Sequence, residues 1–493
     1  MFKQSNKTIK WNKKDYVRAI SLFMVHTVVI FALFVFAAFI DVGYDFKAMI
    51  AVVFSQNNIE ITVYIAIALV LAMMGAYFYF YSEHRDFIYK GKNVNLLFII
   101  LEISIIAMFF VGHYTSIYAR PFALCALLAL LLVNRHTAIF MNTLVCLMMF
   151  MMDVFVANSF VARQDSYSAL VICYTTSLFA IYLVYGLRSR LAVFVMSFPI
   201  AAPVIISCIC LEFYQFIGSP LPYILYGLTS GLLSVVLMMS LLPIFERAFG
   251  VVTDYRLAEI TDHKSTLIRK LIENAPGTFN HSLIVSTLAE SCANAIGENA
   301  LLARACAYYH DIGKLKQPEF FTENQQGYNP HNELTPELST DIIRSHAKYG
   351  YELILKYHLP QILADVALQH HGTLPIRYFY AKALKYTEGD LDIANFSYPG
   401  PKPQTKIAAI IMIADGAEAK VRTLSDRSHA KVDAAVREII EERMNFDQFS
   451  ECELTMKDID IIRATITNSL AGVYHDRVKY PKLKFGKASS GEE

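Results

Sequence analysis

At 493 residues, the chain is longer than one typical domain, so more than one domain is expected. Hydrophobic residues make up 55% of it and the mean hydropathy is +0.38, which is high for a soluble protein. A formal net charge of +1 argues against a protein dedicated to nucleic-acid polymers, which would carry a basic face. The eight cysteines have neither the spacing of a disulfide framework nor that of a thiolate zinc site.

Apolar residues are concentrated before Phe249, in runs that predict membrane helices. A spanning helix needs about 20 mostly apolar residues. Eight runs approach or reach this length, at 17–40, 59–81, 95–115, 120–134, 138–158, 167–187, 191–212 and 222–245. The run at 120–134 is the shortest. The first run is too long for a signal peptide and shows no clear small-residue cleavage site, so we interpret it as a retained anchor.

The distribution of positive charge predicts the orientation of these spans. The leader before the first run carries Lys3, Lys7, Lys10, Lys13 and Lys14. Lysine and arginine favour the cytoplasmic side of a membrane, so the N-terminus is expected there. Alternate loops agree: the cytoplasmic ones carry Arg85, Lys90, Lys92, Arg135, Arg188 and Arg190, and the opposite ones mainly Lys47, Arg120 and Arg163. Eight crossings would return the chain to the cytoplasm before Glu246.

Few ionisable residues lie within the predicted spans. Glu102 and Asp153 stand out, and carboxylates at such positions are candidates for function. We favour the simpler interpretation that each is satisfied by a hydrogen bond between helices, and that His26 is a packed core residue. The sequence shows no series of charged residues of the kind that ion transport requires.

The polar half begins with a connector, in which Asp262 is expected to cap a helix over 265–274 and Pro276-Gly277 to end it. Further helices are predicted over 279–295, 300–312, 336–357, 360–371 and 406–424 by their apolar periodicity. Two amphipathic helices, 432–444 and 456–474, should pack on this bundle. The last ten residues have the composition of a disordered tail.

These helices carry imidazole and carboxylate side chains in a fixed order: His281, His310, Asp311, His346, His370, His371 and Asp415. Such groups are ligands of first-row divalent metals. Each residue alone has an ordinary explanation, as a core or surface histidine, a helix cap, or an aspartate paired with a lysine. The ordered set within one helical region favours a metal site. Asp415 follows an apolar run, so its carboxylate should be buried and needs a partner.

The pair His310-Asp311 stands within the string HDIGK. Adjacent helical residues point about 100° apart, so the two cannot bind one ion through a single helix face. Asp311, with two oxygens, could instead bridge two ions while His310 binds one. Gly313 allows a tight exit from the helix, and Lys314 places a cation beside the site.

The order H…HD…D resembles that of the HD-domain metal-dependent phosphohydrolases, and His346 with His370-His371 is similar to the binuclear subgroup. Longer strings, APGTFNHSL, AYYHDIGKLKQPEFFTENQ, QHHGT and YPGPKPQTK, resemble the membrane-bound 7TM-HD family of cyclic di-AMP phosphodiesterases. The similarity covers the last spans and nearly all of the polar half. It implies a multi-pass protein of the bacterial cell (inner) membrane with both termini in the cytoplasm.

The resemblance also implies a binuclear centre of two divalent ions, manganese or iron. One ion would be held by His281, His310, Asp311 and Asp415, and the other by Asp311, His346, His370 and His371. Two such ions lower the pKa of a water molecule and offset charge on phosphoryl oxygens, so cyclic di-AMP would be opened to a linear pApA-type product. Asp311, His310 and Lys314 would be catalytic. Lys314 and Lys402 are expected to bind phosphate, and Tyr398 to stack on a base.

One feature departs from that family, whose members usually carry a large extracytoplasmic domain between the first two spans. Here the interval is a short loop. Other functions remain open: hydrolysis of another cyclic dinucleotide or of a nucleotide, or a membrane receptor that binds nucleotide without cleaving it. A Gly-Tyr-Pro motif of the HD-GYP type does not follow the second histidine cluster. Dimerisation through helical surfaces is a further hypothesis.

The predicted protein is therefore all-α, a polytopic bundle of about eight spans followed by a cytosolic helical HD domain. Its expected partners are a cyclic dinucleotide and membrane lipid, with a homodimer as an open possibility and no nucleic-acid polymer. The expected segments are a basic leader 1–16, an anchor 17–40, a loop 41–58, a seven-span domain 59–246, a connector 247–278, an HD core 279–425, and C-terminal helices with a tail 426–493.

Overall fold

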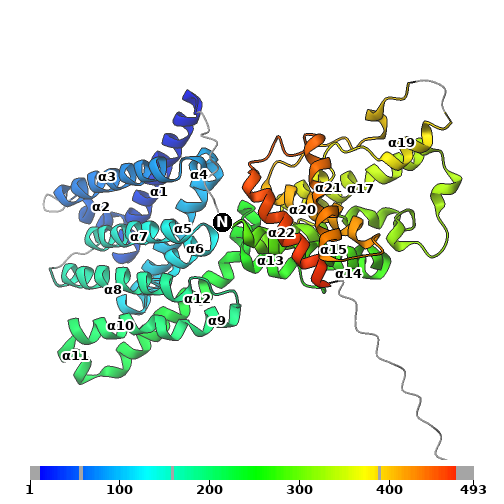
Figure 1. Cartoon of the computed structure of the whole chain (residues 1–493). Helices are drawn as coiled ribbons and strands as arrows, with labels where there is room; N and C mark the ends of the chain where they lie inside the picture. Colours follow the sequence, from blue (N-terminus) through cyan, green and yellow to red (C-terminus); the bar gives the residue numbers. More distant parts are fainter. Residues whose placement is uncertain (1–10, 55–58, 157–159, 387–389, 474–493) are drawn as a thin grey trace, which may run out of the picture. The chain divides into compact units, whose positions relative to one another are not determined.

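The computed structural model describes residues 11–54, 59–156, 160–386 and 390–473. These residues form helices and turns without named strands, apart from an isolated bridge between Pro375 and Ser397. The all-α prediction is confirmed. The chain divides into two compact units, Met1–Arg256 and Leu257–Glu493, and Figure 1 labels many of the helices. Most of the predicted basic leader and the predicted disordered tail lie outside the described residues.

The first unit is built of apolar helices. In chain order they are α1 (Lys13–Asp41), α2 (Phe46–Phe54), α3 (Ile59–Glu83), α4 (Arg85–Tyr89), α5 (Gly91–Tyr114), η1 (Ile117–Ala119), α6 (Leu124–Leu132), α7 (Arg135–Val156), α8 (Phe160–Val184), α9 (Arg190–Val195), α10 (Ser197–Leu211), α11 (Phe213–Gly218) and α12 (Pro220–Phe249). The described residues contain 7 helical segments that are long and apolar enough to cross a membrane. The predicted run at 120–134 falls in the shorter segment Ile117–Leu132, so the count of eight is not confirmed.

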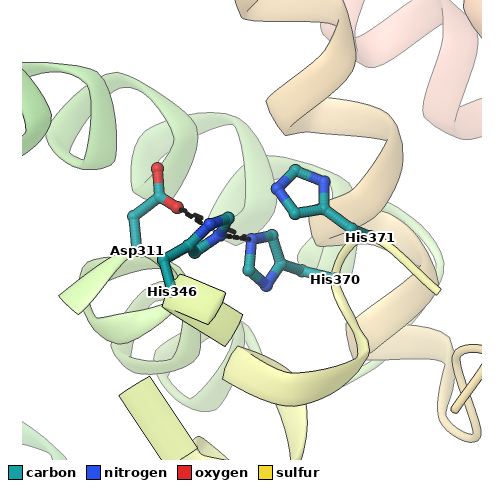
Figure 2. Close-up of side chains that lie close together, drawn as sticks. All are labelled: Asp311, His346, His370 and His371. Atoms are coloured by element: carbon teal, nitrogen blue, oxygen red, sulfur yellow. Dashed lines mark hydrogen bonds and ion pairs between the residues drawn. The ribbon is translucent and has the colours of Figure 1, made fainter. Parts of the chain in front are cut away.

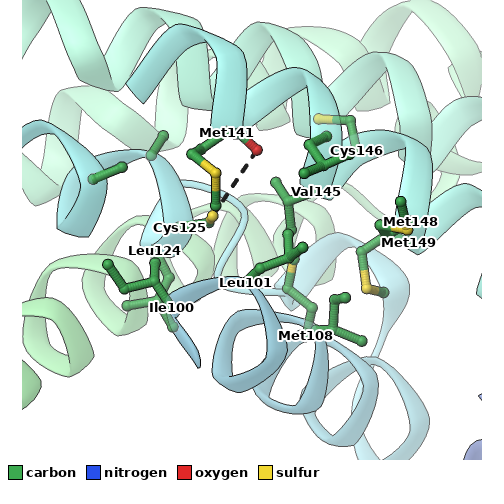
Figure 3. Packing of buried hydrophobic residues seen from close by; sticks show 14 of the residues in the cluster. Ile100, Leu101, Met108, Leu124, Cys125, Met141, Val145, Cys146, Met148 and Met149 are labelled. Atoms are coloured by element: carbon green, nitrogen blue, oxygen red, sulfur yellow. Dashed lines mark hydrogen bonds between the residues drawn. The ribbon is translucent and has the colours of Figure 1, made fainter. Parts of the chain in front are cut away.

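Helix α6 is short and lies inside the first unit. Its nine residues rise about 14 Å, less than half of a typical hydrocarbon core of about 30 Å. Nearly all of them are buried, and Figure 3 shows Leu124 and Cys125 packed among side chains of α5 and α7, such as Leu101 and Val145. This helix is therefore covered by its neighbours along its length.

Hydroxyl groups satisfy the irregular backbone that precedes α6. Ser230 donates to the Arg120 carbonyl at 2.6 Å. Ser177 donates to the Phe122 carbonyl at 2.8 Å, and the next amide, that of residue 123, donates to Ser234 at 3.2 Å. Unpaired backbone groups are costly where water is excluded. These bonds from α8 and α12 explain how the chain leaves the helical path here.

The charged residues that the sequence singled out in this unit are paired. Arg120 binds both oxygens of Asp153, at 2.6 and 2.9 Å. His26 Nδ1 lies 2.7 Å from Glu102 Oε1, and its ring stacks on Phe98. The predicted hydrogen bond between helices is confirmed for Glu102, and His26 is buried as expected. Asp153 is also paired, but with an arginine in the turn before α6.

The second unit begins within α13 (Asp254–Ile260), because the division between the units falls after Arg256. Its further helices are α14 (Thr266–Asn274), α15 (Pro276–Ala295), α16 (Ala300–Tyr309), η2 (Ile312–Lys316), η3 (Pro318–Phe320), η4 (Thr322–Asn324), η5 (Pro330–Glu333), α17 (Pro336–Lys356), α18 (Gln361–Gln369), α19 (Arg377–Ala383), η6 (Ile393–Phe396), α20 (Lys406–Arg422), α21 (His429–Asn445) and α22 (Met456–Val473). Helix α15 packs on α16, α20 and α22, and α21 packs on α20. The predicted packing of the two C-terminal helices on the bundle is confirmed.

Two helix ends differ from the prediction in a way that shapes the site. Helix α16 ends at Tyr309 and α18 at Gln369, so the pairs after them lie in turns and not on helices. The prediction that Asp262 caps α14 is wrong. Its carboxylate instead accepts from the Lys264 amide at 2.8 Å. Turn geometry frees adjacent side chains from the 100° spacing of a helix, so neighbours can reach a common centre.

Candidate metal centre

The first predicted ligand, His281, belongs to the second turn of α15, which starts with Pro276. Pro is favoured at this position because its missing amide has no partner there in any case. The side chain is buried, with its Nδ1 2.6 Å from Glu418 Oε2 and its Nε2 2.9 Å from Asp415 Oδ1. Burial opposes ionisation, but these two carboxylates raise the pKa of His281 to about 10. An ion bound here must therefore compete with a proton.

The His310-Asp311 turn is pressed against α17. A Cβ at Gly313 would lie 1.9 Å from the His346 carbonyl oxygen, so a side chain is excluded at this position. Both His310 and Asp311 are buried. The glycine is thus required for the close approach that brings the turn and the third predicted histidine together.

Three of the histidines are each oriented by the same kind of hydrogen bond, from the ring to a backbone carbonyl. The Nδ1 atoms of His310, His346 and His370 lie 2.6, 2.6 and 2.8 Å from the carbonyl oxygen three residues earlier in the chain. A carbonyl can only accept, so each Nδ1 carries the proton. The Nε2 lone pair of each ring then faces the centre, the orientation that metal-bound histidines adopt.

The Nε2 atoms of these rings and the Asp311 carboxylate are hydrogen-bond acceptors that face one another. His346 Nε2 and His370 Nε2 are 3.3 Å apart, and they lie 3.4 and 3.6 Å from Asp311 Oδ1. Among the described residues, Asp311 Oδ1 and His310 Nε2 are buried without a hydrogen-bond partner. Burial lowers the pKa of His346 to about 3, so that ring stays neutral. Lone pairs so close together repel unless a cation lies between them, and the residues therefore fit a metal ion.

Asp311 stands between two sets of ligands. Its Oδ1 faces His346 and His370, while its Oδ2 lies 3.3 Å from His310 Nε2 and 3.8 Å from His281 Nε2. Ligand atoms within 4.8 Å of one another form two groups, Asp311-His346-His370-His371 and His281-His310-Asp415. Figure 2 shows the first group, with the Asp311 carboxylate and the rings of His346 and His370 converging. The structure thus brings all seven predicted ligands together.

Lys314 lies beside Asp311, as its position in the sequence predicts. Its Nζ is 2.8 Å from Asp311 Oδ2 and 2.7 Å from Glu323 Oε1. Burial opposes its charge, but these two carboxylates raise the pKa of Lys314 above its ordinary value. The ammonium group is therefore charged and held in place by both acids.

The other two predicted substrate residues differ in position. Tyr398 stacks on His371 with ring centres 4.3 Å apart and lines a cavity of about 300 Å³ beside the ligands. Lys402 is not among the residues that line this cavity, and its Nζ pairs with Asp447 at 2.9 Å. The structure brings Tyr398 to the site but does not bring Lys402 there.

Several residues at the centre were not predicted. Glu418 is fully buried and holds His281, and Glu323 holds Lys314. Glu418 follows Asp415 by three residues on the same apolar helix, so the argument that flagged Asp415 could have found it. Arg422 and Arg443 also line the cavity, and Arg443 comes from a helix whose position along the chain gave no signal.

Comparisons with known proteins agree with this architecture. Residues 59–253 match the family described as 7TM receptor with intracellular HD hydrolase, and residues 278–420 match the HD domain. The two matches follow each other along the chain in the order membrane region, then HD domain. The resemblance to 7TM-HD proteins is thereby confirmed, and all seven predicted ligands fall within the HD match.

Two curated relatives of this chain are both named cyclic-di-AMP phosphodiesterase PgpH. Cyclic-di-AMP phosphodiesterase PgpH of Listeria monocytogenes serotype 1/2a (strain 10403S) is 46% identical over 260 residues, 52% of this chain and 36% of that protein. Cyclic-di-AMP phosphodiesterase PgpH of Bacillus subtilis (strain 168) is 36% identical over 420 residues, 82% of this chain and 58% of that protein. The aligned parts thus span about a third and somewhat over half of these relatives.

A solved structure is also similar in sequence. The L. monocytogenes phosphodiesterase PgpH HD domain in complex with cyclic-di-AMP is 49% identical to the matching part of this chain. The match covers 43% of this chain and 99% of that chain, with a TM-score of 0.42.

Proposed function

We propose that this chain is a membrane-bound phosphodiesterase that uses two divalent metal ions to hydrolyse cyclic di-AMP to a linear pApA-type product. The observation that carries the proposal is the position of Asp311, whose two oxygens face two different histidine groups. A carboxylate so placed suits a bridge between two ions. The names of the two PgpH relatives supply the substrate.

In this proposal His281, His310 and Asp415 would hold one ion and His346, His370 and His371 the other, with Asp311 shared. Imidazole and carboxylate ligands suit manganese or iron, and thiolates are absent from both ligand groups that the described residues form. Bound ions would lower the pKa of a water molecule and offset negative charge on the phosphoryl oxygens.

The protein's own side chains have three tasks. The backbone carbonyls and Glu418 orient the histidines, so the ligand atoms need little reorganisation. Lys314, held by Asp311 and Glu323, adds positive charge where charge on the phosphate develops. Tyr398 forms part of the cavity wall, where its ring can contact a base.

We further propose that both termini are cytoplasmic. The 7TM-HD match contains six of the long candidate spans, whereas the family's description counts seven. In this proposal the whole segment Ile117–Leu132 is the remaining crossing, with its non-helical part extending the short α6. With α1 added, an even number of crossings would return the chain to its starting side. Cysteine-accessibility labelling of spheroplasts tests this: Lys90→Cys should be protected from an impermeant maleimide, and Lys47→Cys should be modified.

The outer surface of the membrane unit suits lipid contact. Met24 and Val28 of α1, and Tyr64 and Leu71 of α3, are exposed apolar side chains. Residues of this kind on helices of spanning length are expected to face hydrocarbon. Association of two chains through such faces is a further proposal, and a mass measurement in detergent that finds monomers alone would remove it.

The decisive experiment uses the full-length chain in detergent. It should be incubated with Mn²⁺ and cyclic di-AMP, cyclic di-GMP, mononucleotides or nucleoside triphosphates, and products separated by chromatography. Conversion of cyclic di-AMP to linear pApA, lost on chelation and restored by Mn²⁺, is expected. Preference for another substrate would change the assignment, and absence of turnover with retained nucleotide binding would indicate a receptor.

A further inference from the structure

The cavity beside the metal ligands has a basic wall that the proposed chemistry at the ions does not use. Its lining includes Gly416 and Arg422 of α20 and Arg443 of α21. Arg422 is at the rim, since 44% of its side chain is exposed, whereas that of Arg443 is 13% exposed. A buried guanidinium needs an anionic partner.

Within the described residues, the carboxylate that pairs with Arg443 also pairs with a second arginine. Arg443 Nη1 lies 2.6 Å from Glu442 Oε2, but the other oxygen of Glu442 binds Arg377 at 2.8 Å. The Nε atom of Arg443 is buried without a hydrogen-bond partner among these residues. One carboxylate is thus shared by two arginines, and the Nε donor of Arg443 is left without an acceptor.

The absence of a side chain at Gly416 leaves room for the guanidinium of Arg443. A Cβ at position 416 would lie 2.8 Å from Arg443 Nη2 and 3.1 Å from a methyl carbon of Ile439. Glycine in a helix interior is unfavourable, so a packing reason is expected for it. Here the missing side chain lets the guanidinium lie against α20 next to Asp415.

The proposed substrate provides a matching anion. A cyclic dinucleotide has two phosphodiester groups, and ions held by the metal ligands would engage one of them. Of the cationic residues that line the cavity, Lys314 lies against Asp311 and is assigned above to the phosphodiester that is hydrolysed. We propose that Arg443, packed against Gly416, binds the phosphodiester that is not being hydrolysed. This inference rests on the proposed function and adds a second phosphate subsite to it.

The test compares two substrates that differ in the number of phosphodiesters. Cyclic di-AMP has two and bis(p-nitrophenyl) phosphate has one, and both would be cleaved at the metal centre. The full-length chain in detergent with Mn²⁺ is assayed as wild type, Arg443→Gln, Arg443→Lys and Gly416→Ala. The matched control is Arg437→Gln, on the same helix, where the side chain is exposed and pairs with Asp433.

Loss of a charge-assisted hydrogen bond should raise KM for cyclic di-AMP in Arg443→Gln at least about tenfold. The change in KM for bis(p-nitrophenyl) phosphate should be several times smaller. Arg443→Lys should recover part of the loss, and Gly416→Ala should raise KM in the same direction because its methyl group displaces Nη2. The control should behave as wild type.

The outcomes distinguish a failure of the phosphate subsite from a failure of the proposed function. Equal changes for both substrates, or an unchanged KM for cyclic di-AMP in Arg443→Gln, would overturn the subsite alone. Absence of cyclic di-AMP turnover by the wild-type protein would overturn the proposed function together with the subsite.

Discussion

Buried charge occurs in both units of the chain, but it is compensated differently. In the membrane unit, Arg120 and Asp153 neutralise each other through two hydrogen bonds between α7 and the turn before α6. In the HD unit, Lys314 pairs with Oδ2 of the Asp311 carboxylate, but Oδ1 faces the Nε2 lone pairs of His346 and His370. The first arrangement is complete within the protein, whereas the second is complete when a cation is added.

The difference shows how to interpret a carboxylate in an apolar run. Asp153 and Asp415 both appear in such runs, and burial alone does not distinguish them. What distinguishes them is their surroundings: Asp153 is paired with an arginine, whereas Asp415, besides its contact with His281, lies 3.9 Å from His310 Nε2 and 3.8 Å from His371 Nδ1. Four changes, from the largest expected effect to the smallest, probe this contrast.

Asp311→Asn should abolish phosphodiester hydrolysis. The amide has nearly the same size as the carboxylate, but it offers one oxygen in place of two. It therefore cannot bridge the two ions proposed at the two histidine groups. Turnover of cyclic di-AMP with Mn²⁺ is the measurement, and Asp341→Asn, an exposed position on α17, is the matched control. Activity close to wild type in Asp311→Asn would refute the bridging role.

Arg120→Gln should destabilise the membrane unit by about 3–5 kcal/mol, because it leaves a buried carboxylate without its counter-charge. The double variant Arg120→Gln/Asp153→Asn should be more stable than the sum of the single losses predicts. Thermal unfolding in detergent, read from helical circular dichroism, measures both. Strictly additive losses would show that the pair is not coupled.

Glu418→Gln should weaken metal binding by about 10–100-fold, the usual effect of removing a group that orients a metal-bound histidine. The fully buried carboxylate accepts from His281 Nδ1, and an amide cannot provide the same charge. Mn²⁺ titration followed by calorimetry measures the affinity. Glu438→Gln, an exposed partner of Lys420, should leave it unchanged; equal effects in the two variants would remove the orienting role.

Asp458→Asn should lower stability by about 1 kcal/mol through loss of a helix cap. Asp458 accepts from the Thr455 amide at 3.1 Å and pairs with Lys406 at 2.7 Å. Burial raises the pKa of Asp458, but Lys406 and Thr455 outweigh it, so the pKa lies below the ordinary value. This contribution is present above the unfolded-state pKa and is lost as pH falls through the folded-state pKa. Unfolding at pH 7 and pH 3 should therefore differ less in Asp458→Asn than in wild type.

Much of the architecture follows from local pattern. Apolar runs longer than about 20 residues predicted the seven long helical segments, and apolar periodicity predicted the longer helices of the HD unit but not the short α13 and α19. The ligand set was also visible, because histidines and aspartates recur in a fixed order. These features depend on residues close together in the chain, so they can be recognised without knowing the fold.

Other features depend on partners that the fold brings from far away. His281 is held by Glu418, 137 residues later, and the guanidinium of Arg443 reaches Gly416 from a different helix. Lys402 looked suited to phosphate but lies against Asp447. The residue types and their order were therefore enough to predict a helical membrane protein with a metal-binding domain. Which acids orient the ligands, and which cations line the cavity, was decided by tertiary packing, because a side chain's charge and hydrogen bonds depend on neighbours that local periodicity does not specify.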